Sequence, residues 1–541
     1  MRELILRCAL ENAVKYGGQA NFNSVLGAAF GIIKEGDKKE IINLTKKIVN
    51  EVNSMNLQAQ REMLKELGEI KKIKKRKKAI GLENVKGKVV MRFAPNPNGY
   101  LSFGHCRPAL WNWLFVKKYK GRYVLRFDDT DPRIKVPLKE AYREIKKDLE
   151  WLGVKPHSIV FQSKRLKIYY VYAEKLIRMG KAYVDTLPAE KMRKMLWVSS
   201  ISDEREESVD VVMQKWKKMF TKYKDGEAVL RIKTDINHPN PAVRDWAAFR
   251  IINKNKHPLV KARVWPLLNF ASAIDDHEFG VTHILRGIDL EISDGRQKYI
   301  YEYFGWGYPT TMYHGKFFIS GIKSTSEVLE LIKEGKLSGW DDPRLGTIAA
   351  LRKRGFQSET IVNFIKNSGI GKVDITVNTS SLAALNKEIV DKTANRHFVV
   401  LNPRKIKIKN APEMKVEISL HPDFPKRGVR KFKTKNEFYV DETFQPGKNY
   451  RFIDLFNFRD LEFVSKGLDP ELDAKMIHWL PVSKDLVNVE LVMPDNSVLK
   501  GLGERDLKKV KVNEVVQFVR TGFVRCDKKL KNKVVFYFGH K

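Results

Sequence analysis

Two short segments of the sequence carry residue types that suit ligand chemistry. The first, residues 92–105, is predicted to be the end of a strand, a proline-rich turn and the start of a helix. The free N–H groups and the dipole at a helix start favour an anion such as phosphate, and Gly104 would let it approach closely. A Gly-His pair at a helix start, here Gly104-His105, is also common as a purely structural feature. The segment is therefore a candidate nucleotide site with a structural alternative.

The second segment places three carboxylates at the end of another predicted strand, within Leu125–Pro132. Asp128, Asp129 and Asp131 suit either a divalent metal ion or the amino group of a substrate. An acidic loop on the surface would have the same composition. The residue types alone leave all three interpretations open.

Both segments follow strands of a predicted parallel sheet. Apolar residues at 89–93 and 123–127 indicate buried strands, and residues 107–114 and 139–152 indicate helices between and after them. This alternation predicts βαβ units in a doubly wound, Rossmann-like sheet of the α/β class. Ligands of such sheets bind beyond the carboxyl ends of the strands, so the two segments should line one crevice.

The two ends of the chain have different patterns. Apolar residues at three- and four-residue spacing from Leu4 to about Leu67 predict a small helical bundle. It is followed by the basic block Lys71–Lys78, which suits either a solvated tether or an arm that faces phosphate. After about residue 375, alternating stretches such as Val487–Val492 and Val515–Val519 predict antiparallel β structure in one or two barrels.

Composition limits the class of protein. The 541 residues include 101 Lys and Arg against 64 Asp and Glu, a net charge of +37, and 43% are hydrophobic. Length and apolar fraction predict several packed domains. The charge favours a nucleic-acid partner, although a generally lysine-rich surface would give the same excess. Three widely spaced cysteines argue against a disulfide framework. No apolar run approaches the ~20 residues that span a bilayer, so we expect a cytoplasmic protein with no membrane partner.

Ordered matches along nearly the whole chain resemble one family, the glutamyl-tRNA synthetases of the archaeal and eukaryotic type. These are class I enzymes similar to glutaminyl-tRNA synthetase. Besides the two segments above, the matching stretches are Asp148–Gly153, Gly180–Val184, Asn240–Trp246, Asp275–Gly287, Ser338–Leu345, Asn395–Phe398, Ile477–Pro481 and Phe536–Lys541. The N-terminal helices resemble the family only loosely.

The resemblance implies a reaction and an architecture. Glutamate and ATP would give glutamyl-adenylate, and the glutamyl group would pass to the terminal adenosine of tRNA(Glu), with Mg²⁺ accompanying the triphosphate. A monomer is favoured. The implied domains are an N-terminal helical region with a basic tether (1–85), a Rossmann-like catalytic domain with an inserted acceptor-binding domain (86–320), a signature loop and helical connector (321–385), and antiparallel β-barrel anticodon-binding domains (386–541).

Roles carry over from the family residue by residue. Arg92 would face the side-chain carboxylate of glutamate, because Arg offers a bidentate fork, and Asp128 would take the amino group. Asp131 stands where the glutaminyl branch typically has Asn, which favours glutamate. The other implied amino-acid contacts are Asn96, Leu268 and Arg286. The implied ATP site is Pro95, Ser102, Gly104, His105, Lys323, Ser324 and Ser326, with His105 and Lys323 as catalytic residues and no metal ligand from the protein.

Three departures from the family pattern bear on activity. The first signature, usually His-Ile-Gly-His, reads Ser102–His105, so one of two phosphate-facing imidazoles is missing. The second usually ends in Lys but reads Ser324–Glu327, which would set a carboxylate where pyrophosphate leaves. Lys323 could substitute for the missing cation. Leu268 replaces an aromatic hydroxyl of the amino-acid pocket.

Two functions stay open at this point. One is an active glutamate–tRNA ligase with divergent signatures, and the other is a tRNA-binding paralogue with impaired catalysis. We favour the ligase because Arg92, His105, Asp128 and Arg286 are all present. Whether tRNA(Gln) is charged as well depends on which anticodon bases the C-terminal domains accept, and the sequence leaves that choice open.

Overall fold

The structure is a computed structural model that describes residues 1–33, 37–67, 80–319 and 324–541. The chain divides into two compact units, Met1–Ala79 and Ile80–Lys541. None of the helices in the described ranges combines the length and the apolarity needed to cross a bilayer.

The first unit is helical. Its helices are α1 (Arg2–Lys15), α2 (Phe22–Ile32), α3 (Lys38–Asn53) and α4 (Leu57–Leu67). Buried residues recur at helical spacing, as in Ile41, Ile48 and Val52 of α3, so each helix turns one apolar stripe inward. The helical bundle predicted over residues 4–67 is confirmed. The basic block Lys71–Lys78 lies outside the described residues.

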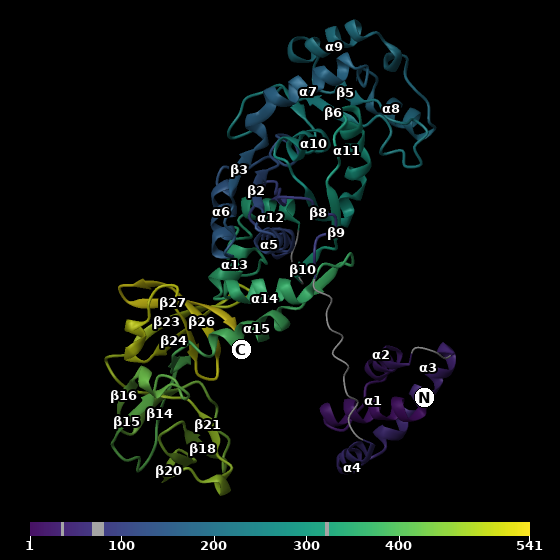
Figure 1. The fold of residues 1–541 in the computed structure, drawn as a ribbon. Helices are drawn as coiled ribbons and strands as arrows, with labels where there is room; N and C mark the ends of the chain where they lie inside the picture. The colour runs from purple at the N-terminus through teal and green to yellow at the C-terminus, as the bar shows by residue number, and fades with distance from the viewer. Residues whose placement is uncertain (34–36, 68–79, 320–323) are drawn as a thin grey trace. The chain divides into compact units, whose positions relative to one another are not determined.

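A parallel sheet opens the second unit (Figure 1). Its elements alternate along the chain: β1 (Val90–Phe93), α5 (Phe103–Lys118), β2 (Arg122–Phe127), α6 (Ala141–Trp151) and β3 (Ser158–Phe161). The parallel pair β8 (His283–Gly287) and β9 (Thr310–His314) lies beside β1, because the Thr282 N–H donates to the Val90 carbonyl at 3.0 Å. The predicted parallel strand–helix order is confirmed.

One core joins α5 to this sheet. Phe103, Leu110 and Phe115 of α5 are buried together with Met91 of β1 and Leu125 of β2. Because apolar residues fill both sides of this contact, the start of α5 is held at the carboxyl ends of the strands.

An α/β segment is inserted between β3 and β8. Its elements are η1 (Gln162–Arg165), α7 (Leu166–Arg178), β4 (Ala182–Asp185), α8 (Ala189–Trp197), η2 (Asp203–Glu206), α9 (Val209–Thr221), β5 (Val229–Ile232), β6 (Ala247–Ile251), β7 (Val264–Pro266) and α10 (Leu268–Glu278). The strands form an antiparallel sheet in the order β4-β5-β6-β7. Tyr169, Trp216 and Phe249 share its core with Phe270 of α10, which carries the segment back toward the parallel sheet.

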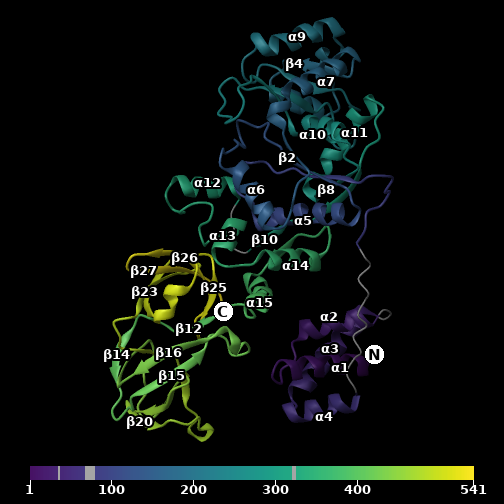
Figure 2. The same ribbon diagram turned by 60° about the vertical axis from the view of Figure 1, so that its left-hand side comes forward.

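Helices connect the parallel sheet to the C-terminal part (Figures 1 and 2). After β8 the chain forms η3 (Ile288–Leu290), α11 (Glu291–Tyr303), β9, β10 (Phe317–Ile319), α12 (Thr325–Lys333), α13 (Ile348–Lys353), α14 (Ser358–Ser368), β11 (Ile375–Val377) and α15 (Thr379–Val390). The Asn386 side-chain amide of α15 lies 2.8 Å from Nε2 of His540, near the end of the chain.

The C-terminal part is rich in β structure. A seven-stranded sheet has the order β12 (Arg396–His397), β25 (Val515–Phe518), β26 (Gly522–Leu530), β27 (Lys533–His540), β23 (Val487–Val492), β24 (Val498–Gly503) and β13 (Val399–Leu401). Three smaller sheets are β14 (Arg404–Lys407), β17 (Glu437–Val440) and β22 (Leu480–Pro481), then β15 (Met414–Ser419) and β16 (Val429–Thr434), then β20 (Glu462–Ser465), β19 (Asn457–Arg459), β18 (Asn449–Phe452) and β21 (Lys475–Ile477).

The antiparallel β structure expected there is present, with three parallel exceptions among the paired strands. Most pairs are antiparallel, but β12 with β25, β18 with β21 and β23 with β27 are parallel. Parallel neighbours need a crossover connection, and here each pair is separated by intervening strands rather than by a tight turn. Alternation of apolar residues predicts a strand but not the direction of its partner.

Three buried cysteines lie in three different cores. Cys8 packs in the first unit, Cys106 in the core between α5 and the parallel sheet, and Cys526 in the seven-stranded sheet. Burial raises the pKa of the Cys8 thiol to about 11 and also raises the pKa values of Cys106 and Cys526. These thiols are therefore inert inside the folded protein.

Candidate active site

A cavity of about 910 Å³ opens where the strands of the parallel sheet end. The two chemical segments meet here, because the Asp128 N–H donates to the Pro95 carbonyl at 3.1 Å and the Asn96 amide donates to the Asp128 carbonyl at 3.0 Å. The predicted shared crevice is confirmed. The predicted site residues that line it are Arg92, Pro95, Asn96, Ser102, Gly104, His105, Asp128, Leu268, Arg286, Ser324 and Ser326. Lys323 lies outside the described residues.

Two arginines and two aspartates form a buried network at the cavity wall, and of the four only Asp276 does not line the cavity. Arg126 donates from Nε to Oδ1 of Asp128 at 2.6 Å and from Nη2 to its Oδ2 at 3.2 Å. Its Nη1 reaches Oδ1 of Asp276 at 2.6 Å, and the same oxygen accepts from Nε of Arg92 at 3.1 Å. Among the described residues, the Nη groups of Arg92 donate no hydrogen bond, and only its Nε does so. They are left to face the cavity that Arg92 lines.

The electrostatics of this network keep its charges in place. Burial alone would raise the pKa of Asp276, but Arg92, Arg126 and Arg286 together hold it below its ordinary value. Burial raises the pKa of Asp128, which Arg126 and Arg92 only partly oppose. A buried carboxylate with this character binds a cation readily, because a new positive charge favours its ionised form.

Arg286, which also lines the cavity, is fixed by a second set of contacts. Its Nη1 lies 2.6 Å from Oδ1 of Asp294, and its Nη2 donates to Oε1 of Gln297 at 3.1 Å. The hydroxyls of Tyr308 and Tyr313 also donate to Asp294. The guanidinium is therefore held in one orientation before any ligand arrives.

His105 is a neutral imidazole that turns one N–H toward the cavity. Its Nδ1 accepts the backbone N–H of Ser102 at 3.1 Å, so Nδ1 carries no proton and Nε2 does. Burial, with the nearby Lys135, lowers the pKa of His105 to about 4. The imidazole at the start of α5 can therefore donate a hydrogen bond to an anion at neutral pH without carrying charge.

Backbone packing gives one reason for a glycine at position 104. A Cβ at this position would lie 2.7 Å from the carbonyl oxygen of Phe317, so the approach of α5 to β10 already requires glycine. The close approach of a nucleotide at Gly104 stays a prediction beside this packing reason. The residue lines the cavity, and its missing side chain also makes room for the backbone of β10.

The three aspartates of the acidic turn after β2 have different surroundings. Asp129 is fully buried and accepts from the Tyr142 hydroxyl at 2.7 Å and from the Ser163 N–H at 2.8 Å, so it is structural. Asp131 lines the cavity and accepts from Nη2 of Arg250 at 2.6 Å. Within the described ranges no group of three or more His, Cys, Asp or Glu side chains is suited to holding a metal. Asp128 lines the cavity, and recognition of an amino group by Asp128 stays a prediction.

The segment at the start of α12 forms another wall. Ser324 caps the helix by accepting the N–H of Glu327 at 3.4 Å, and Ser324, Thr325 and Ser326 line the cavity. Glu327 sits in the first helical turn, where a carboxylate suits the helix dipole, and it is not part of the cavity wall. Leu268, at the start of α10 and 44% exposed, adds an apolar surface.

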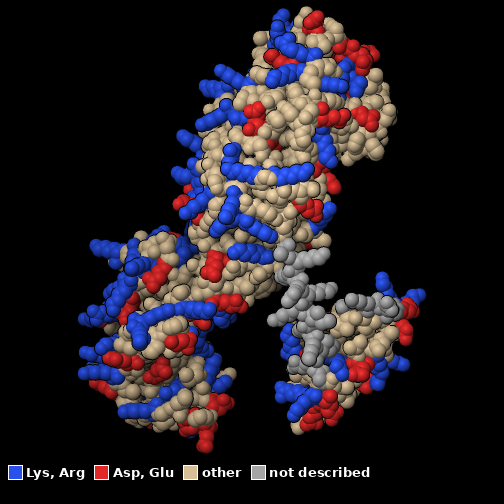
Figure 3. All heavy atoms as spheres, in the orientation of Figure 1, with Lys and Arg blue, Asp and Glu red and all other residues tan. Residues whose placement is uncertain are grey.

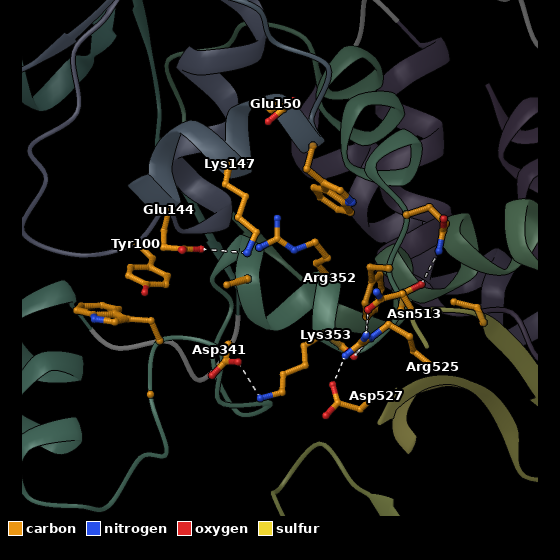
Figure 4. Close-up of a pocket in the computed structure, with 18 residues that line it drawn as sticks. Tyr100, Glu144, Lys147, Glu150, Asp341, Arg352, Lys353, Asn513, Arg525 and Asp527 are labelled. Atoms are coloured by element: carbon orange, nitrogen blue, oxygen red, sulfur yellow. Dashed lines mark hydrogen bonds and ion pairs between the residues drawn. The ribbon is translucent and has the colours of Figure 1, made fainter. Parts of the chain in front are cut away.

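A second cavity, of about 1000 Å³, lies between the helical connector and the C-terminal sheet (Figure 4). Charged side chains on its walls pair with one another: Lys353 with Asp341 at 2.7 Å and Arg525 with Asp527 at 2.5 Å. Arg525 also donates from Nε to the Lys353 carbonyl at 2.6 Å. These contacts join β26 to α13, so we interpret this cavity as a junction between domains.

Sequence reasoning missed Arg126, Arg250 and Asp276. Arg126 stands inside a predicted strand, and Asp276 stands inside a matched stretch, so both were visible as residues of interest. Their signal is a charged residue at a buried position of a strand or helix, which is rare unless it is paired.

Comparison with known proteins agrees with this geometry. The description "tRNA synthetases class I (E and Q), catalytic domain" matches residues 88–392, and the anti-codon binding domain of the same family matches residues 394–475 and 476–527. The chain is 47% identical to a glutamate–tRNA ligase from Pyrococcus horikoshii, 46% identical to one from Pyrococcus furiosus and 43% identical to one from Methanocaldococcus jannaschii, with 100% of both chains covered each time. The resemblance seen in the sequence is confirmed. A parallel-sheet catalytic domain, a β-rich anticodon-binding part and these matches together establish that the chain belongs to the class I aminoacyl-tRNA synthetases of the glutamate and glutamine family.

Proposed function

We propose that the protein ligates glutamate to tRNA(Glu) through glutamyl-adenylate formed from ATP. The observation that carries this proposal is the single cavity that gathers Arg92, Asp128 and the start of α5 at the end of the parallel sheet. The relatives named above are glutamate–tRNA ligases over their full length, which favours an active ligase over an impaired tRNA-binding paralogue.

Two of the three charged groups of glutamate, the side-chain carboxylate and the ammonium, fit the two ends of the buried network. The Nη groups of Arg92 would bind the side-chain carboxylate, and Asp128 would accept the ammonium group. Arg286, Asn96 and Leu268 would hold the rest of the amino acid. Asp131, which accepts a hydrogen bond from Arg250, stands where the glutaminyl branch typically has Asn, and we propose it as a residue that favours glutamate over glutamine.

ATP would lie along the start of α5. Its phosphates would accept the Nε2–H of His105 and free N–H groups of the helix start, near Pro95, Ser102 and Gly104. Ser324 and Ser326 would approach from the other wall, and we propose Lys323 as the cation at the leaving pyrophosphate. Mg²⁺ would be carried mainly by the triphosphate, because Mg²⁺ keeps several waters and needs few protein carboxylates.

The tRNA would be bound along the second unit. Lys and Arg side chains are spread over the face of this unit seen in Figure 3, over both the catalytic and the β-rich parts, and such a surface suits a phosphate backbone. We propose the insertion between β3 and β8 as the acceptor-binding domain. The proposed boundaries are 1–85, 86–320, 321–385 and 386–541, with the last forming β-barrels, and the proposed state is a monomer in the cytoplasm.

Charging assays with purified tRNAs test the proposal. We expect ATP-dependent attachment of labelled glutamate to tRNA(Glu), and no attachment of glutamine. Tight tRNA binding without glutamylation under any condition would instead support the paralogue. A parallel reaction with tRNA(Gln) decides whether the enzyme is non-discriminating.

A further inference from the structure

Asp276 of α10 bridges two arginines, Arg92 and Arg126, that line the cavity proposed as the glutamate site. A single oxygen, Oδ1, accepts both Nε of Arg92 at 3.1 Å and Nη1 of Arg126 at 2.6 Å. Arg126 in turn grips both oxygens of Asp128. The side chain of Asp276 therefore connects the group proposed for the substrate carboxylate with the group proposed for its ammonium.

A charged bridge is needed at this position. Arg92 and Arg126 are both buried, and both lower the pKa of Asp276, the carboxylate that they share. Burial also lowers the pKa of Arg92 itself. Without a shared anion, two buried guanidinium groups would repel each other and move apart or toward water. Because one oxygen serves both, the position of each guanidinium depends on the other.

Asp276 acts from behind the cavity wall. It is 1% exposed and does not line the cavity, whereas Arg92, Arg126 and Asp128 all do. Its Oδ2 is buried and has no hydrogen-bond partner among the described residues. A buried oxygen left unpaired costs stability, and this cost is tolerated while Oδ1 holds both guanidinium groups.

We infer that Asp276 is a positioning residue for glutamate, which fixes the Nη groups of Arg92 and, through Arg126, the carboxylate of Asp128. This inference rests on the proposed function of Arg92 and Asp128. Asp276 touches neither substrate nor ATP in this arrangement. It should therefore affect the binding of the amino acid and leave the nucleotide site intact.

The neighbouring aspartate provides a matched control. Asp275 is equally buried on the same helix, but it accepts from Nε of Arg165 at 2.8 Å and from the Tyr169 hydroxyl at 2.7 Å. Neither partner lines the glutamate cavity. Asp275→Asn and Asp276→Asn thus remove one buried charge each from adjacent positions, and only the second alters an oxygen that accepts hydrogen bonds from Arg92 and Arg126.

The experiment measures glutamylation of tRNA(Glu) by the full chain at varied glutamate and varied ATP. We expect Asp276→Asn to raise KM for glutamate about 10- to 100-fold, the range for loss of a charge-assisted hydrogen bond, with KM for ATP within about twofold of the wild type. Asp275→Asn should leave both KM values unchanged. Melting temperatures of both variants identify any general loss of stability, and Asp276→Glu, which keeps the charge but shifts it by one methylene, replaces Asp276→Asn if that variant does not fold.

Arg92→Ala separates the possible failures. If Arg92→Ala raises KM for glutamate and Asp276→Asn does not, the positioning role is wrong while the proposed function stands. If Arg92→Ala also leaves this KM unchanged, the proposed role of Arg92 fails and the inference fails with it. Equal rises in both KM values with equal losses of melting temperature in the two Asn variants would mean a structural role only, and would overturn the inference. In a double variant that combines Arg92→Ala with Asp276→Asn, the second substitution should raise KM for glutamate less than Asp276→Asn does alone, because Arg92 is then already absent.

Discussion

The rings of Tyr100 and Trp340 are stacked, with centroids 5.6 Å apart and planes 14° apart. Tyr100 belongs to the turn between β1 and α5, and Trp340 follows α12. Gly99 lies in the same contact, since a Cβ there would be 2.5 Å from both the Thr325 methyl group and the Trp340 ring. The turn that leads into the first signature thus packs, through this aromatic pair, against the segment that follows α12.

This packing predicts that Gly99→Ala is harmful. An added methyl group would force the turn away from α12, and overpacking of this kind costs about 1–3 kcal/mol. We expect a lower melting temperature and slower glutamylation. Gly307→Ala is the control, because a Cβ at Gly307 meets nothing within 4 Å, and its effect should stay within about 0.5 kcal/mol. Equal behaviour of the two variants would contradict the packing argument.

His105 should make the protein sensitive to acid. Its pKa in the folded protein is about 4, below the ordinary value of 6.5, so the unfolded chain binds more protons between these pH values. The contribution of His105 to the free energy of unfolding is therefore complete above pH 6.5 and is lost as pH falls toward 4, by about 1–3 kcal/mol. Melting temperatures at pH 5 and pH 7.5 should differ less for His105→Asn than for the wild type. An equal difference would show that the imidazole is not buried as described.

Asp148 should have the opposite pH dependence. Its carboxylate is buried, and burial raises its pKa to about 7 although Arg352 lies 3.2 Å away. The folded protein then binds the extra proton between about pH 4 and pH 7, and the stability this gives is lost as pH rises through 7. Asp148→Asn keeps the neutral shape at every pH. The melting temperature of Asp148→Asn minus that of the wild type should therefore be larger at pH 8 than at pH 5. An equal difference at both pH values would contradict the raised pKa.

Binding of tRNA should weaken steeply with salt. The net charge of +37 implies many contacts to phosphate, and the slope of log affinity against log salt counts the phosphates neutralised. Filter binding or anisotropy at several salt concentrations measures it. Replacing Lys71, Lys72, Lys74 and Lys75 by Gln lowers the slope if the basic block contacts RNA, whereas an unchanged slope identifies a tether.

The sequence predicted the elements of the catalytic part well because their signals are local. The apolar run at 89–93 and the helix through Leu110 depend on neighbouring residues in the chain, and both are present as β1 and α5. The carboxyl-edge rule then brought the turns after β1 and β2 together without any contact information.

Contacts between distant segments were not predictable in this way. The reason for Gly104 is the backbone of Phe317, and the orientation of Arg92 depends on Asp276, 184 positions away in the chain. Adjacent aspartates Asp275 and Asp276 look alike in the sequence, but successive helical residues point about 100° apart, so they reach different partners. Only the packing of α10 against the sheet decides which of the two serves the site.

The three buried cysteines can report where and how fast the fold opens locally. Each thiol reacts with a modifying reagent only when its surroundings open, and Cys8, Cys106 and Cys526 occupy separate cores. Time-resolved labelling followed by peptide mass measurement would report the opening rate of the N-terminal helices, the catalytic sheet and the C-terminal sheet in one experiment. Protection of Cys106 by ATP and glutamate, with Cys8 labelled at its usual rate, would locate ligand-induced rigidity within the chain without any introduced label.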